Sequence, residues 1–192
     1  TTINLATSLS AINKKILLID ADPQGNASTG IGISYENRSP NLYDLIVNEF
    51  LDLSSIKKTI VPGLDIITAN TNLAASEIEL AEVKNREFVI SNLFSKIEGY
   101  DYILIDCPPA LGLLTINALV ASNSIIIPLQ SEFFALEGIS SLVNSIELIR
   151  ENFNPSLVIE GILLTMVDKR NSLSALVEKD VRNHFGQTVY KT

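Results

Sequence analysis

The chain has 192 residues, with 22 Asp plus Glu against 14 Lys plus Arg, which gives a formal net charge of −8 at pH 7. Its 46% hydrophobic and 19% charged residues exclude a disordered chain, and its acidity excludes a basic surface over the whole molecule. A local basic patch for DNA remains compatible with this composition. From the length we expect a single domain over residues 1–192.

Cysteine content and apolar run lengths restrict the chain further. Cys107 is the only cysteine, which excludes a disulfide framework and favours a reducing, cytoplasmic location. The longest apolar stretches, such as residues 125–127, are far shorter than the ~18 residues that a membrane span requires. We therefore expect a soluble protein without a membrane partner.

Short, continuous apolar runs alternate along the chain with segments of helical spacing. The runs predict buried strands, and apolar residues three or four positions apart predict helices. In chain order, we expect a helix through Leu5, Leu9 and Ile12, a strand at 16–19, a helix through 42–46, a strand at 64–67, a helix through Phe88, Leu93 and Ile97, strands at 102–105 and 125–127, a helix at 136–152, a strand at 159–164 and a helix at 173–185. This order predicts an α/β fold with a mostly parallel, twisted sheet flanked by helices.

Both ends of the sequence look truncated. Thr1 already lies in helical register without a preceding strand, and residues 188–190 begin an apolar, β-prone run where the sequence stops. We therefore interpret the chain as a fragment of a longer domain.

Polar residues follow four of the predicted strands. Ligands of an open parallel sheet bind beyond the carboxyl ends of the strands, so these segments are the candidate site. The four segments are 20–26, 106–112, 128–132 and 165–171.

Three aspartates carry most of the chemistry in these segments. Asp106 follows an apolar strand in the manner of a Walker B carboxylate that holds Mg²⁺, although an aspartate there could also cap the following helix. Asp20 and Asp22 would repel each other unless a cation, water or solvent takes up their charge. A metal-bound nucleotide supplies that counter-charge, and a solvated turn is the alternative.

The segment Asp20-Ala21-Asp22-Pro23-Gln24-Gly25-Asn26 resembles the ParA/Soj-type partitioning ATPases, a branch of the deviant-Walker P-loop proteins that includes MinD. Further segments resemble the same family in order and spacing, so the resemblance covers essentially the whole chain. These segments are 4–6, 102–109, 135–138, 161–168 and 184–186.

The resemblance implies a doubly wound, three-layer P-loop fold and an ATPase that uses ATP and Mg²⁺. It further implies a homodimer that sandwiches ATP, binds DNA non-specifically, and hydrolyses ATP when a ParB-type centromere-binding partner stimulates it. Such a protein would act in the bacterial cytoplasm, in association with the nucleoid.

The resemblance also assigns roles to residues. Asp22 would position the attacking water, Asp106 would help to hold Mg²⁺ through water, and Asp20 would support the metal and phosphate network. Two further groups belong to nucleotide binding, one in the second, γ-phosphate-sensing switch and one in part of the adenine pocket. The switch residues are Pro108, Pro109 and Gly112, and the pocket residues are Thr165, Met166 and Asp168.

The sequence departs from the family at the phosphate-binding loop. The 192 residues contain no Gly-rich loop with lysine, so the loop and its Mg²⁺-ligating threonine are expected upstream of Thr1. Thr1 and Thr2 are then helix neighbours of that threonine and not assigned as ligands. The family's C-terminal strand and helix are also outside the sequence. We therefore expect these 192 residues alone not to hydrolyse ATP.

Lys179 and Arg182 lie three positions apart and would share a helix face, where they could contact DNA phosphates, or simply be solvated. Two other functions remain open: a MinD-like ATPase that cycles on the membrane and places the division site, and a truncated, non-catalytic binding module. The segments 22–26 and 107–109 favour partitioning over the MinD-like function.

Overall fold

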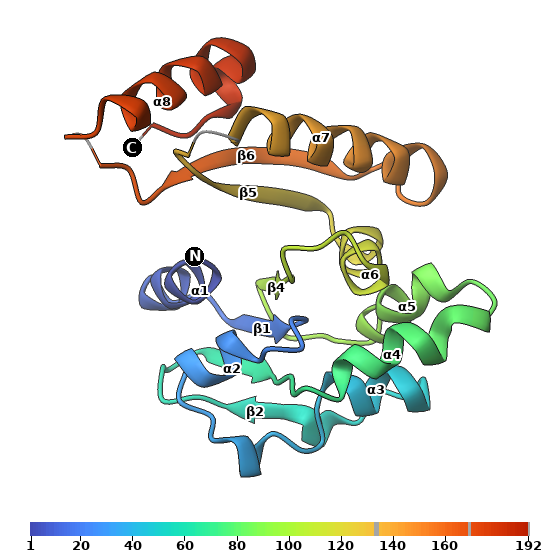
Figure 1. Cartoon of the computed structure of the whole chain (residues 1–192). Helices are drawn as coiled ribbons and strands as arrows, with labels where there is room; N and C mark the ends of the chain where they lie inside the picture. Colours follow the sequence, from blue (N-terminus) through green and yellow to red (C-terminus); the bar gives the residue numbers. More distant parts are fainter. Residues whose placement is uncertain (133–134, 169, 192) are drawn as a thin grey trace. The chain divides into compact units, whose positions relative to one another are not determined.

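A computed structural model describes residues 1–132, 135–168 and 170–191 (Figure 1). The chain divides into two compact units, Thr1–Ala121 and Ser122–Thr192, and each is described by itself. Strands alternate with helices in both units, which confirms the predicted α/β class.

The first unit contains a four-stranded sheet with the order β2-β3-β1-β4. The strands β1 (Ile16–Asp20), β3 (Leu64–Ile67) and β4 (Tyr102–Asp106) are mutually parallel. The short strand β2 (Ile56–Lys58) pairs antiparallel with β3 at the edge. All five residues of β1 are buried because β1 is flanked by two strands and covered on both faces, and this explains its continuous apolar sequence.

Six helices cover this sheet, joined in places by single 3₁₀ turns. They are α1 (Thr2–Ala11), α2 (Asn26–Gly30), α3 (Leu42–Asn48), α4 (Leu73–Glu79), α5 (Val89–Phe94) and α6 (Leu113–Ala121). The 3₁₀ turns are Tyr35–Asn37, Leu53–Ser55, Leu80–Glu82 and Arg86–Phe88.

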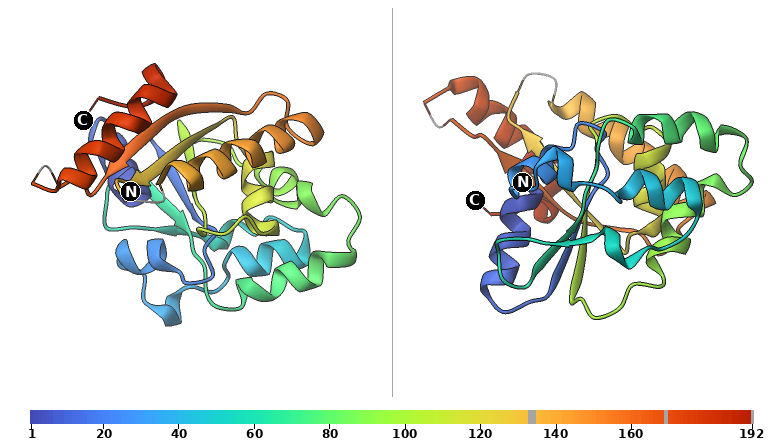
Figure 2. Two further views of the ribbon diagram at one scale, coloured as in Figure 1. Left: turned by 45° about the horizontal axis from the view of Figure 1, so that its top comes forward. Right: turned by 90° about the horizontal axis from the view of Figure 1, so that it is seen from below.

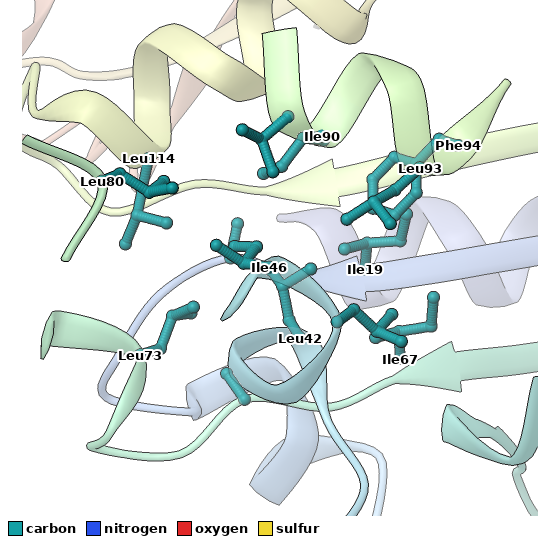
Figure 3. Close-up of a cluster of buried hydrophobic side chains, with 14 of the residues drawn as sticks. Ile19, Leu42, Ile46, Ile67, Leu73, Leu80, Ile90, Leu93, Phe94 and Leu114 are labelled. Atoms are coloured by element: carbon teal, nitrogen blue, oxygen red, sulfur yellow. The ribbon is translucent and has the colours of Figure 1, made fainter. Parts of the chain in front are cut away.

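The side chains of β1 point alternately into two apolar clusters, one on each face of the sheet. Leu17 and Ile19 pack with residues of α3, α4, α5 and α6, including Leu42 and Ile90 (Figure 3). Ile16 and Leu18 pack on the opposite face with residues of α1 and α2. The first unit is thus a helix–sheet–helix arrangement of three layers, as the resemblance implied.

The second unit contains the parallel strands β5 (Ser124–Gln130) and β6 (Val158–Thr165), whose register shifts between Ile125 and Ile126. The long helix α7 (Ala135–Asn152) runs beside them, and α8 (Ser172–Phe185) follows β6 (Figure 2, left). After the 3₁₀ turn Gly186–Thr188, Val189 forms a parallel bridge with Ile162. The β-prone run at 188–190 is therefore used as a sheet contact.

Some predicted boundaries were wrong. The helix α1 ends at Ala11, and Ile12, which we expected on its apolar stripe, is 64% exposed. The helix α5 spans only six residues, so Phe88 and Ile97 lie outside it. The apolar stripe of α8 consists of Val177 and Val181, whereas Leu176 is exposed.

Candidate nucleotide and magnesium site

Asp20 and Asp106 lie opposite each other at the carboxyl ends of the neighbouring strands β1 and β4. The backbone N–H of Ala21 donates to the carbonyl oxygen of Asp106 at 2.8 Å, which holds the two strand ends together. Both aspartates were expected beyond the carboxyl ends of parallel strands. The structure places them together at one edge of the sheet, because β1 and β4 are parallel neighbours.

Asp20 is fully buried, and its side chain is held by Ser28 of the short helix α2. Its Oδ2 accepts hydrogen bonds from the backbone N–H of Ser28 at 2.7 Å and from the Ser28 hydroxyl at 2.6 Å. Burial raises the pKa of Asp20, and the neighbouring Asp106 carboxylate adds to this, whereas the bonds from Ser28 oppose it. The ionised form of Asp20 is therefore costly unless a positive charge is close by.

Asp106 is half-buried, and its Oδ1 accepts a hydrogen bond from the Thr2 hydroxyl at the start of α1. Sequence reasoning assigned no role to Thr2. The contact joins residues 104 positions apart, so no local pattern in the sequence could have indicated it. It places a hydroxyl oxygen next to the carboxylates at this edge.

Asp22 lies on a tight turn between β1 and α2. Its Oδ1 accepts from the backbone N–H of Gln24 at 2.9 Å, and its carbonyl oxygen accepts from the N–H of Gly25, also at 2.9 Å. Gly25 has a φ of 64°, a left-handed conformation that favours glycine, and it directly precedes α2. The turn leaves the Asp22 carboxylate half-buried, with its orientation set by the backbone.

Pro108, Pro109 and Gly112 lie in the loop from β4 to α6, directly after Asp106. A Cβ built on Gly112 would lie 2.3 Å from Oε1 of Glu77, and the same oxygen accepts from the N–H of Leu114 at 3.2 Å. A carboxylate of α4 therefore contacts this loop and the first turn of α6. Sequence reasoning had not singled out Glu77.

Cys107 begins the same loop. Burial, together with the carboxylates of Asp106 and Asp22, raises the pKa of its thiol to about 12. The thiol is therefore protonated at neutral pH, which is the state of a packed side chain rather than of a redox-active or nucleophilic cysteine.

The donor atoms at this edge suit magnesium. Among the described residues, no group of three His, Cys, Asp or Glu side chains is arranged to hold a metal ion. Mg²⁺ does not need such a cage, because proteins usually hold it with one or two carboxylates, waters and the phosphates of a nucleotide. Asp106, with Asp20 and Asp22 beside it, fits that requirement.

Three further expected residues belong to the second unit. Thr165 ends β6, and its hydroxyl donates to the carbonyl oxygen of Leu129 at 3.4 Å. Met166 is 82% exposed and adopts a φ of 53°. Asp168 forms an ion pair with Arg170 at 3.1 Å, and the hydrogen bonds from Arg170 lower its pKa.

The expected DNA contacts also lie in the second unit, on α8. Lys179 is exposed, whereas Arg182 is half-buried and pairs with Glu178 at 2.9 Å. The Nη1 of Arg182 also donates to the carbonyl oxygen of Tyr190. The positive charge of Arg182 is thus already partly compensated within its own helix.

One buried cation near the Asp22 turn had no signal in the sequence. Arg38 is 6% exposed and lines a pocket of about 520 Å³ with Pro23, Gln24 and Thr29. The pocket is also lined by residues 32–35, 70 and 71. Arg38 belongs to no motif and is separated in sequence from every residue of the expected site.

Comparisons with known proteins agree with this geometry. A family model described as an AAA domain matches residues 1–159. The chromosome partitioning protein ParA of Caulobacter vibrioides is 49% identical over 193 residues, which cover 99% of this chain and 72% of that protein. The sporulation initiation inhibitor protein Soj of Bacillus subtilis is 46% identical, over 100% of this chain and 76% of that protein.

A solved structure shares the fold and carries ligands. Cobyrinic acid a,c-diamide synthase from Mycobacterium smegmatis, solved with a bound ATP analogue and magnesium, superposes with a TM-score of 0.89 at 29% identity. The match covers 96% of this chain and 76% of that one. Its identity is well below that of the two partitioning relatives, and the match shows that the two chains share a fold.

The mostly parallel sheet, its flanking helices and the acidic strand ends are those of a P-loop ATPase. Within that class, the chain belongs to the ParA/Soj family of partitioning ATPases. In the part of the chain that the structure describes, no helix is long and apolar enough to cross a membrane.

Proposed function

We propose that this protein is an ATP-dependent switch for partitioning DNA in the bacterial cytoplasm, in association with the nucleoid. The observation that carries the proposal is the pairing of Asp20 with Asp106 at one sheet edge, with Asp22 on the next turn, in a chain 46–49% identical to two partitioning proteins. This arrangement supports hydrolysis of Mg²⁺-bound ATP.

In this proposal each residue has a role that its position supports. Asp22 orients the attacking water, because its carboxylate is half-buried and fixed by the turn to Gly25. Asp106 and Asp20 hold and support the cation, which when bound neutralises the negative charge of the phosphates. Pro108, Pro109 and Gly112 respond to the γ-phosphate as the second switch.

Nucleotide binding also involves the second unit. Thr165, Met166 and Asp168 follow β6 and contribute part of the adenine pocket. The exposed Met166 side chain and the Thr165 hydroxyl offer an apolar and a polar contact, respectively, to a base.

The ATP-bound state is a homodimer that sandwiches the nucleotide and binds DNA non-specifically. A ParB-type centromere-binding protein then stimulates hydrolysis and releases the dimer. Lys179 and Arg182 of α8 contribute phosphate contacts, and pairing two copies doubles the number of phosphates neutralised. We assign Lys179 the larger share, since Arg182 already pairs with Glu178.

The test is phosphate release from Mg²⁺·ATP by the complete protein, measured with and without duplex DNA and the ParB-type partner. We expect Asp22→Ala to abolish turnover and to retain the ATP-dependent dimer. Loss of ATP binding in that variant would show that its role is wrongly assigned. Residues 1–192 alone should show no turnover, because they contain no Gly-rich phosphate-binding loop.

A second arm of the same experiment measures whether the protein binds DNA or a membrane. ATP-dependent sedimentation with duplex DNA, and none with anionic lipid vesicles, supports partitioning. The reverse result would favour the MinD-like, membrane-cycling function, and binding of neither ATP nor DNA would favour a non-catalytic module.

A further inference from the structure

Arg38 is a buried cation whose guanidinium forms no salt bridge among the described residues. It follows the 3₁₀ turn Tyr35–Asn37 and is 6% exposed. Over the described residues, no Asp or Glu oxygen lies within 4.0 Å of its guanidinium nitrogens. A buried charge is costly without compensation, so its retention calls for a specific set of hydrogen bonds.

The hydrogen bonds of Arg38 reach three separate segments. Nη1 donates to the carbonyl oxygen of Ala69, just after β3, at 3.1 Å. Nη2 donates to the Thr29 hydroxyl in α2 at 2.7 Å, and Nε and Nη2 both approach the carbonyl oxygen of Ile33 at 3.4 Å. The planar group thus joins the end of β3 to α2 and to the loop that follows α2.

Two contacts continue from Arg38 to the Asp22 turn. The Thr29 hydroxyl, which accepts from Arg38, donates to the carbonyl oxygen of Gly25 at 3.0 Å. The guanidinium also packs against Gly25 itself, since a Cβ built there would lie 2.3 Å from Nη1. Gly25 in turn donates its N–H to the Asp22 carbonyl oxygen, so the turn is held at its far end by Arg38.

The same segment is tied to the buried carboxylate of Asp20. The N–H of Ala69 donates to the Ser28 hydroxyl at 3.0 Å, and that hydroxyl donates to Asp20. Both backbone groups of Ala69 are therefore used: the carbonyl oxygen accepts from Arg38, and the N–H reaches Asp20 through Ser28. A single network thus fixes both aspartates that precede α2.

We propose that Arg38 is a positioning residue for ATP hydrolysis, which holds the Asp22–Gly25 turn so that the Asp22 carboxylate stays aimed at the attacking water. The inference rests on the proposed function of Asp22. It acts through geometry, because a small displacement of a positioning group lowers the rate of the chemical step far more than it lowers substrate affinity.

Lysine cannot replace Arg38 in this role. The guanidinium is a planar fork that donates in several fixed directions at once, whereas an ammonium is a point charge on a flexible chain. Arg38→Lys therefore keeps the charge and most of the volume and removes the simultaneous contacts to Ala69, Thr29 and Ile33. The variant therefore tests the hydrogen-bond geometry of the guanidinium while the positive charge is kept.

The experiment measures steady-state hydrolysis of Mg²⁺·ATP by the complete protein, together with its thermal unfolding. For Arg38→Lys we expect kcat to fall by about tenfold or more while KM for ATP stays within about twofold. A merely structural role would change KM and kcat together, in step with a lowered Tm. Such a joint loss would overturn the inference.

A milder variant tests the same network in case Arg38→Lys does not fold. Thr29 is exposed, and Thr29→Val removes the hydroxyl that joins Arg38 to Gly25, so we expect kcat to fall about threefold to tenfold with a smaller loss of Tm than in Arg38→Lys. Thr71→Val makes the same chemical change at a nearby exposed threonine outside this network, and should leave kcat within about twofold.

The outcomes separate this inference from the function on which it rests. Absence of turnover in the wild-type protein would overturn both. Wild-type turnover that Arg38→Lys and Thr29→Val leave within about twofold would overturn the role of Arg38 alone. Equal losses in Thr29→Val and Thr71→Val would also overturn it, because the loss would then not depend on the network.

Discussion

Gly112 lies close to a carboxylate oxygen of α4, and replacing it with alanine tests that contact. The new Cβ would lie 2.3 Å from Oε1 of Glu77, a distance that real Cβ atoms do not tolerate. Gly112 has no left-handed φ, so alanine is compatible with the backbone. We expect the Glu77 side chain to be displaced, because the carboxylate is the end of a flexible side chain and moves more easily than backbone.

The magnitude follows from what Glu77 does in this position. Its Oε1 accepts from the N–H of Leu114, one of the first four N–H groups of α6, which have no partner within the helix. A capping contact of this kind is worth about 1 kcal/mol, with a further ~0.3–1 kcal/mol from the charge at a helix N-terminus. We therefore expect Gly112→Ala to lower the free energy of unfolding by about 1–2 kcal/mol. At roughly 2–4 °C per kcal/mol for a chain of this size, the Tm should fall by a few degrees.

A double-mutant cycle measured by urea unfolding checks the reasoning. Glu77→Ala alone should cost about as much as Gly112→Ala, since both remove the same cap. Gly112→Ala introduced into the Glu77→Ala protein should cost nothing, because the group it would displace is gone. Additive losses in the double variant would refute the assignment of Glu77 as the group that Gly112 accommodates.

Three further predictions concern the acidic edge of the first unit. Because burial raises the pKa of Asp20, the folded protein binds this proton more tightly than the unfolded chain, and its stability falls as the pH rises above the ordinary value of 3.8. Asp20→Asn should therefore raise the Tm of the nucleotide-free protein at pH 7 by a few degrees, at ~2–4 °C per kcal/mol. This gain in Tm should shrink toward pH 4, and a gain that stays constant would contradict the reasoning. The thiol of Cys107, with a pKa of about 12 against an ordinary 9.0, should hold about a thousandfold less thiolate than a free cysteine at pH 8, so labelling by iodoacetamide as fast as that of glutathione would be inconsistent with its surroundings. Asp106→Ala should weaken Mg²⁺-dependent ATP binding by about tenfold or more, as measured by calorimetry, and leave binding without Mg²⁺ unchanged; equal weakening in both conditions would exclude a role in holding the cation.

The parts of the fold that the sequence predicts are those with a local signal. The run of apolar residues at 16–19 is continuous because β1 is buried on both faces. The strand and the aspartate that ends it could therefore be located from the sequence pattern alone. The edge strand β2 is only three residues long and contains two lysines, so it has no apolar run to find. The short helices α2, α4 and α6 follow loops and carry no long apolar period.

The missed site residues lack a signal for a different reason. Arg38 contacts Ala69 from 31 positions away, and Glu77 contacts Leu114 from 37 positions away. Each is a charged residue outside any recognisable motif, and only the tertiary structure brings it to its acceptor or donor. The aspartates were predictable because parallel strands end at a common edge, whereas nothing in the periodicity of the sequence specifies the groups that orient them.

The pairing of Asp20 with Asp106 also has a consequence for the cohesion of the sheet. The two carboxylates end neighbouring strands, so without a cation their repulsion acts against the last rung of the β1–β4 ladder. Neutralising them therefore strengthens the strand pairing itself as well as retaining the nucleotide. The carboxyl end of β1 should consequently be the first part of this ladder to exchange its amide hydrogens when magnesium is withdrawn, and its exchange should slow again when the cation is restored.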